Sequence, residues 1–147
     1  MVQLAAGRFA GFWLLPSASV EEGSLAETAA KMLPERAGYL PVAQQLVSVQ
    51  EEPKTGVLAL RFVFAAQAGE GTAPRDPEIA RACWMDRDAV TELLAERELV
   101  PTLGVMHLAR AWAEQIVLPP LATLTEETAC PCGSGFSYRG CCGWDMQ

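Results

Sequence analysis

The sequence predicts an α/β domain of the α+β kind, followed by a small metal-binding segment at the C-terminus. Apolar stretches with strand-like and helix-like periodicity alternate as far as residue 118. Four of the five cysteines then lie within thirteen residues near the end of the chain. With 147 residues, 50% of them hydrophobic, the chain can form one core of ordinary size and one appendage. We therefore divide it into a domain (1–118), a linker (119–129) and a cysteine segment (130–147).

The domain is predicted to begin with a strand and a helix. Phe9–Leu15 is the expected strand, and Ser24–Ala37 is the expected helix. Ser24 and Glu27 have the S-x-x-E spacing of a capping box, in which each side chain bonds to the other residue's backbone N–H. Gly38 stands where a glycine commonly ends a helix.

Further elements are predicted from apolar runs between turn residues. The expected strands are Gln44–Gln50, Gly56–Ala65 and Ile79–Met85, and the expected helices are Asp86–Glu96 and Thr102–Leu118. The segment 66–77 is rich in Gly, Pro and Ala and is expected to be a loop. The single histidine, His107, falls in the last helix, where we expect a surface or packing role rather than a catalytic one.

The cysteines of the C-terminal segment form two pairs separated by eight residues. The residues between the pairs are small, flexible or polar, so the segment cannot form a core and needs a cross-link. A four-sulfur site suits Zn²⁺ or an iron centre, and we expect a closed, structural Zn²⁺ site. Two disulfides are the alternative. They are disfavoured because no signal peptide opens the sequence, which predicts a cytoplasmic protein, and because adjacent cysteines are hard to pair without strain.

Charge and hydropathy argue against two classes of partner. The formal net charge is −7 and the eleven basic residues are scattered, whereas a nucleic-acid surface needs clustered Lys and Arg. No apolar run reaches the length of a membrane span. A phosphorylated small molecule remains compatible with an acidic chain if a divalent metal bridges the two.

The cysteine segment resembles the SEC-C zinc motif. That motif reads Cys-x-Cys-x8-Cys followed by His or Cys, with Gly-Ser-Gly after the second cysteine, and here it is matched by CPCGSGFSYRGCCG. The resemblance implies a zinc site with four ligands: Cys130, Cys132, Cys141 and Cys142. It also implies contact with a protein partner through the residues in the middle of the motif, expected to be exposed: Phe136, Tyr138 and Arg139.

Residues 8–115 resemble the Nudix hydrolases, because several of that family's motifs occur in the right order. The matching segments are Phe12–Pro16, Val20–Leu25, Gly38–Tyr39, Asp76–Ile79 and Cys83–Met85. The first is similar to the W-x-L-P sequence that precedes the family's signature motif, the Nudix box. The second is similar to the V-E-x-G-E-S-L start of that motif with one residue missing, and the third to its closing glycine. The last two are similar to a later strand of the family that reads E-I-x-x-x-x-W. The resemblance implies an α/β/α sandwich around a mixed sheet, and hydrolysis of a nucleoside diphosphate linked to another group.

The family's metal site is degenerate in this sequence. Its helix carries R-E-x-x-E-E, whose glutamates hold Mg²⁺ or Mn²⁺ against the diphosphate, since hard cations need several carboxylate oxygens. Lys31–Arg36 occupies that place. Met32 replaces the first glutamate, Arg36 replaces the last, and Glu35 alone remains. One carboxylate beside an arginine would bind Mg²⁺ poorly.

Two functions remain open on this basis. The favoured one is a catalytically impaired module that binds a nucleotide-like ligand or a protein and carries the zinc knuckle. The alternative is an active Mg²⁺- or Mn²⁺-dependent hydrolase of a nucleoside diphosphate derivative. Glu35 would then be its catalytic carboxylate, with Glu21, Glu22 and Lys31 binding metal or substrate.

The first strand of the Nudix sheet is expected to be missing. Only seven residues precede Arg8, too few for that strand and its hairpin partner. Three explanations are open: the start lies inside a longer gene, the domain is truncated, or a partner supplies the strand. An unpaired neighbouring strand would expose an edge that pairs readily with another chain, which makes a homodimer one arrangement to consider.

Overall fold

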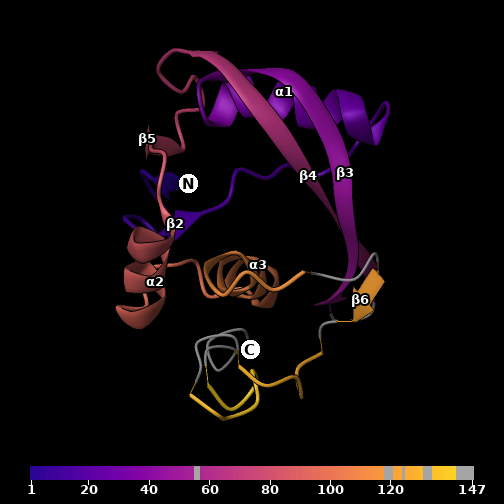
Figure 1. Ribbon diagram of the computed structural model, residues 1–147, viewed down its shortest axis with the longest axis vertical. Helices are drawn as coiled ribbons and strands as arrows, with labels where there is room; N and C mark the ends of the chain where they lie inside the picture. Colours follow the sequence, from indigo (N-terminus) through magenta and orange to yellow (C-terminus); the bar gives the residue numbers. More distant parts are fainter. Residues whose placement is uncertain (55–56, 118–120, 124, 131–133, 142–147) are drawn as a thin grey trace. The chain divides into compact units, whose positions relative to one another are not determined.

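The computed structural model describes residues 1–54, 57–117, 121–123, 125–130 and 134–141 (Figure 1). Its helices are α1 (Leu25–Arg36), α2 (Arg87–Ala95) and α3 (Leu103–Ala113). Its strands are β1 (Val2–Leu4), β2 (Trp13–Leu14), β3 (Tyr39–Lys54), β4 (Val57–Gly71), β5 (Ile79–Ala82) and β6 (Leu121–Thr123). The predicted α+β class is confirmed. None of the helices in the described part of the chain has the length and apolar character needed to cross a bilayer.

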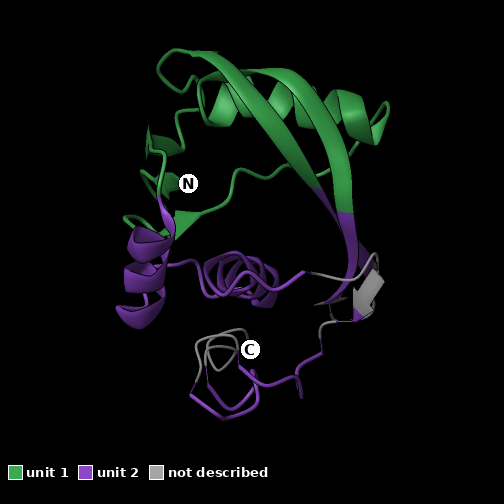
Figure 2. Ribbon diagram, in the orientation of Figure 1, with its two compact units in different colours: residues 1–47, 64–85 green, residues 48–63, 86–147 purple. Residues whose placement is uncertain are grey.

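The chain forms two compact units (Figure 2). Unit 1 consists of residues 1–47 and 64–85, and unit 2 consists of residues 48–63 and 86–147. The long strands β3 and β4 contribute to both units. The division at residues 118 and 129 that the sequence suggests stays a prediction.

Unit 1 contains a three-stranded sheet in the order β2-β1-β5. Its central strand, β1, is antiparallel to both neighbours and pairs Val2 with Leu14 and with Ala82. The N-terminal amine donates to the carbonyl of Cys83 at 2.9 Å, which fastens the start of the chain. Val2 on the central strand β1 and Trp13 on the edge strand β2 are both buried.

The expectation that the residues before Arg8 are too few for a strand is wrong, because β1 lies there; its hairpin partner β2 follows Arg8. A three-residue strand is enough, because the connection from β1 to β2 turns back sharply. Gly7 and Gly11 adopt φ angles of +82° and +86° in that connection, a region that glycine enters without a steric penalty. The same turn shortens the predicted strand at Phe9–Leu15 to Trp13–Leu14.

Helix α1 begins and ends as its sequence predicts. Ser24 is the N-cap, and its hydroxyl accepts a hydrogen bond from the Glu27 amide at 3.2 Å. The Glu27 carboxylate accepts one from the Ser24 amide at 2.9 Å, which completes the capping box. Gly38 follows the helix with a φ of +76°, the left-handed conformation expected of a terminating glycine.

Strands β3 and β4 are much longer than predicted. The Thr72 amide donates to the Gly38 carbonyl at 2.6 Å, so the far ends of the two strands meet as in an antiparallel pair. The prediction of a loop over 66–77 is therefore wrong for residues 66–71, which belong to β4. Their Ala- and Gly-rich composition has low strand propensity, but pairing along β3 overrides it. In unit 2, β3 also pairs in parallel with β6, giving the order β4-β3-β6.

Unit 2 is built around the packing of α2 against α3. The predicted N-cap of α2 is confirmed, since the Asp86 carboxylate accepts from the Ala89 amide at 2.9 Å. The buried apolar residues of the two helices and their connection are Val90, Leu93, Leu99, Val100, Leu103, Val105, Met106, Leu108, Ala109 and Ala111. They form the core of this unit.

Helix α3 ends at Ala113, five residues before the predicted end at Leu118. Gln115 adopts a φ of +57°, which stops the helix. The Ile116 amide then donates back to the Ala111 carbonyl at 2.8 Å, the 6→1 bond of a Schellman motif. This end was not predictable from the sequence, because the residue in the left-handed position, Gln115, is not a glycine.

Helix α2 also ends in a Schellman motif with a non-glycine residue in the left-handed position. Arg97 is exposed with a φ of +58°, and the Glu98 amide donates to the Leu93 carbonyl at 3.0 Å. A non-glycine residue in this conformation costs about 1–2 kcal/mol. Arg97→Gly should therefore raise the free energy of unfolding by about 1 kcal/mol, measured by urea denaturation. Arg97→Ala is the matched control, because it removes the same side chain but keeps the Cβ, and it should give no such gain.

Candidate functional site

The residues predicted to bind metal or substrate at and before α1 are all exposed. Glu21 and Glu22 lie in the connection before α1, and Lys31 and Glu35 lie on α1 itself. The backbone carbonyl of Glu35 accepts hydrogen bonds from the amides of residues 75 and 76, at 2.8 and 3.1 Å. Within the described ranges, no three His, Cys, Asp or Glu side chains are grouped so that they could hold one metal ion.

The guanidinium of Arg36 makes polar contacts with three residues of unit 1. Its Nε donates to Asp76 Oδ2 at 2.7 Å and its Nη2 to Glu78 Oε2 at 3.1 Å. Its Nη1 donates to the backbone carbonyl of Ser17 at 2.7 Å. The guanidinium thus joins the end of α1 to the segment before it and to the turn before β5. The sequence identified Arg36 as a charge reversal but did not reveal these partners, which are up to 42 residues away.

Asp76 is held in its charged form by this arrangement. The hydrogen bond from Arg36 lowers the pKa of Asp76 below its usual value, and a hydrogen bond from the Glu78 amide, 2.8 Å from Asp76 Oδ1, lowers it further. Only 19% of the Asp76 side chain and 20% of the Arg36 side chain remain exposed. The ion pair is therefore shielded from water more than an ordinary surface pair.

Glu27 is committed to the helix cap, as predicted. Hydrogen bonds from the backbone and then the side chain of Ser24 lower the pKa of Glu27. Its carboxylate oxygen Oε2 receives both, at 2.9 and 3.0 Å. This carboxylate therefore has a structural role at the start of α1.

The structure places two of the predicted zinc ligands, Cys130 and Cys141, in one cluster. Cys130 and Tyr138 are buried with Leu103, the first residue of α3, and Cys141 packs against this cluster. The Cys130 amide donates to the carbonyl of Phe136 at 2.7 Å, which folds the segment back on itself. The other two predicted ligands, Cys132 and Cys142, lie outside the described residues.

The surroundings of Cys141 fit a zinc ligand. Ser134 Oγ lies 3.2 Å from Cys141 Sγ and donates a hydrogen bond to it. Zinc-bound thiolates accept such bonds from neighbouring groups, which orient the ligand and offset its charge. The described donor set, a buried cysteine and a second cysteine packed beside it, therefore fits the expected metal.

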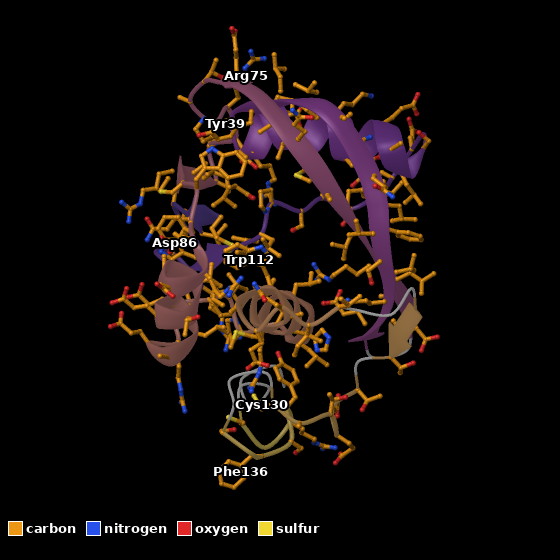
Figure 3. All side chains as sticks on the ribbon, in the orientation of Figure 1. Tyr39, Arg75, Asp86, Trp112, Cys130 and Phe136 are labelled. Carbon is orange, nitrogen blue, oxygen red and sulfur yellow. The ribbon has the colours of Figure 1, made fainter. Side chains whose placement is uncertain are left out.

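One of the three expected contact residues is not exposed. Tyr138 is 2% exposed and its hydroxyl donates to the Pro101 carbonyl, so it anchors the segment to the start of α3. The prediction of an exposed Tyr138 is wrong, because its ring completes the cluster around Cys130. Phe136 is 66% exposed. Arg139 is also exposed, and its Nη1 lies 3.6 Å from Glu126 Oε2. Cys130 and Phe136 of this segment are labelled in Figure 3.

Sequence reasoning missed a polar cluster in unit 2. Ser48 and Gln50 are the buried polar residues of β3, and Glu52 continues the same alternation toward the end of the strand. Part of the signal was present, because Ser48 and Gln50 alternate at the end of the predicted strand Gln44–Gln50, whereas Glu52 lies beyond its predicted end. The sequence alone could not tell that this polar face, rather than the other, is the buried one.

Comparisons with known proteins complete this description. No protein-family model, no curated protein and no solved structure matches the chain. The resemblances to the Nudix hydrolases and to the SEC-C motif therefore rest on the quoted motifs.

Proposed function

We propose that this chain is a Nudix-like binding module that does not hydrolyse diphosphates, and that its C-terminal segment is a structural zinc site that contacts a protein partner. The Nudix-like α/β/α sandwich and the zinc knuckle are parts of the same proposal. The observation that carries it is the position of Arg36. A guanidinium stands where the family has its last metal-binding carboxylate.

The contacts of Arg36 support the loss of hydrolysis. Its charge is directed at Asp76 and Glu78, two carboxylates that would otherwise be available to a cation. Glu35, the carboxylate retained from the motif, is exposed. A divalent cation placed beside it would meet a fixed positive charge on the next residue instead of a second carboxylate, and hard cations bind weakly to such sets.

The packing of the cysteine segment supports a structural and docking role for zinc. A site with four protein ligands leaves no position for water and does no chemistry of its own. Cys130 is buried against α3, whereas Phe136 and Arg139 face solvent. An exposed aromatic residue beside an arginine is a common centre of a protein contact.

The absence of hydrolysis is tested with a panel of nucleoside diphosphate derivatives in the presence of Mg²⁺ or Mn²⁺. Release of phosphate or nucleotide should not exceed that of a protein-free blank. Release that disappears in Glu35→Gln and persists in Glu127→Gln, a change at an exposed carboxylate of unit 2, would overturn the proposal in favour of an active hydrolase. Release that is unchanged in Glu35→Gln does not come from this site.

The docking role is tested by affinity capture with variants that keep the metal. Phe136→Ala and Arg139→Ala should reduce partner recovery while zinc content stays at one equivalent. If both variants and Cys141→Ser recover the same partners as the unmodified chain, the segment has no docking role.

A further inference from the structure

The inner face of β3 in unit 2 is polar, although it is buried. Ser48 and Gln50 are 4% and 0% exposed, and they occupy alternate positions of the strand. Side chains two residues apart share one face of a strand, so Glu52 belongs to this face as well. A buried strand face is normally apolar, because a polar side chain loses its hydration there.

Helix α3 covers this face at its first turn. Glu52 forms an ion pair with Arg61 of β4 at 2.7 Å, and both side chains are about four-fifths buried, at 18% and 19% exposed. A Cβ added at Gly104 would lie 2.5 Å from Arg61 Nε and 2.6 Å from Glu52 Oε1. The helix approaches the ion pair this closely because residue 104 has no side chain. His107 lies one turn further along α3, on the same side as Gly104.

Four buried polar atoms in this region have no hydrogen-bond partner among the described residues. They are Gln50 Oε1, Gln50 Nε2, Arg61 Nε and His107 Nε2. They come from three elements of unit 2, namely β3, β4 and α3. Buried polar groups are almost always paired, and a completely buried amide with neither atom paired destabilises the fold. A ligand that forms hydrogen bonds with these atoms would remove this destabilisation when it binds.

The charges of the cluster favour a neutral ligand. Arg61 and Glu52 compensate each other, and burial lowers the pKa of His107, which favours its neutral ring. The amide of Gln50 offers a donor and an acceptor side by side. Its complement is a planar edge with an N–H next to a C=O.

We propose that the polar face of β3 around Gln50, together with Arg61 and His107, is a binding site for a small neutral molecule with an amide edge, as in a lactam or a nucleobase. Gln50 pairs with both groups of that edge, and Arg61 Nε and His107 Nε2 bond to its remaining polar atoms. The site goes beyond the proposed function, because it uses neither the carboxylates near α1 nor the cysteines.

The binding test uses uracil and 2-pyrrolidone, which share the amide edge, and 1,3-dimethyluracil, which lacks the N–H. Titrations followed by backbone-amide NMR should show saturable binding of uracil or 2-pyrrolidone, and none of 1,3-dimethyluracil. Binding of uracil alone identifies a nucleobase site, and binding of both identifies a general amide site. Gln50→Leu should weaken binding at least tenfold. Gln45→Leu, the same change at an exposed position of β3, should not.

Stability gives a second, independent readout. Because the Gln50 amide is unpaired without ligand, Gln50→Leu should leave the melting temperature unchanged or raise it. A clear fall in the melting temperature would mean that the amide already has a partner in the fold, and would overturn the proposal. Failure of both amide compounds to bind the unmodified chain, or equal binding to Gln50→Leu, would overturn it as well.

Discussion

Replacing Cys130 with serine is expected to abolish zinc binding and to unfold the cysteine segment. A structural zinc site folds its segment through metal binding, with apparent free energies of about 10–16 kcal/mol in zinc-finger peptides. Cys130 is buried with Leu103 and Tyr138, so the loss should extend to the start of α3. We expect zinc content to fall from about one equivalent to less than a tenth, and the melting temperature of unit 2 to fall with it.

The measurement pairs metal analysis of protein purified under reducing conditions with thermal unfolding. Cys83→Ser is the matched control, because Cys83 belongs to unit 1 and follows β5. The Cys83→Ser variant should keep one equivalent of zinc. A chelator should reproduce the Cys130→Ser phenotype in the unmodified chain. Less than about half an equivalent of zinc in the unmodified chain, or full zinc content in Cys130→Ser, would contradict the zinc site.

Features encoded by neighbouring residues were predictable from the sequence. The capping box of Ser24 and Glu27 and the terminating Gly38 depend on residues within α1 or beside it, and both features are confirmed. The cap at Asp86 is confirmed for the same reason. Such signals operate within one helical turn, so no knowledge of the tertiary fold is needed to find them.

Features that depend on distant partners were not predictable. Strand β1 forms because Val2 meets residues 14 and 82, and β4 continues to Gly71 because β3 lies beside it. The contacts of Arg36 span up to 42 residues, so the sequence could indicate a reversed charge but not an ion-pair network. Likewise, the sequence could not show that α3 packs against the Glu52–Arg61 pair on this face of β3.

Replacing Arg36 with methionine is expected to destabilise unit 1 by about 1–3 kcal/mol at pH 7. Methionine keeps most of the apolar stem but leaves Asp76 shielded from water without its cation, and the Ser17 carbonyl without its donor. Removing one member of a fully buried pair costs about 3–5 kcal/mol, and partial exposure reduces that figure here. Urea denaturation measures the change. Arg75→Met, a change at an exposed arginine next to Asp76 in the sequence, is the control and should change stability by less than about 0.5 kcal/mol.

The pH dependence of stability identifies Asp76 as the partner. Because its folded pKa lies below its unfolded value of about 3.9, Asp76 contributes stability above that pH and loses it as the pH falls through the folded pKa. The unmodified chain should therefore lose stability below about pH 4, while Arg36→Met and Asp76→Asn should lose less over the same interval. In a double-mutant cycle at pH 7, the two substitutions should be strongly non-additive. Additive effects would mean that Arg36 does not act through Asp76, and would leave that carboxylate available to a divalent cation.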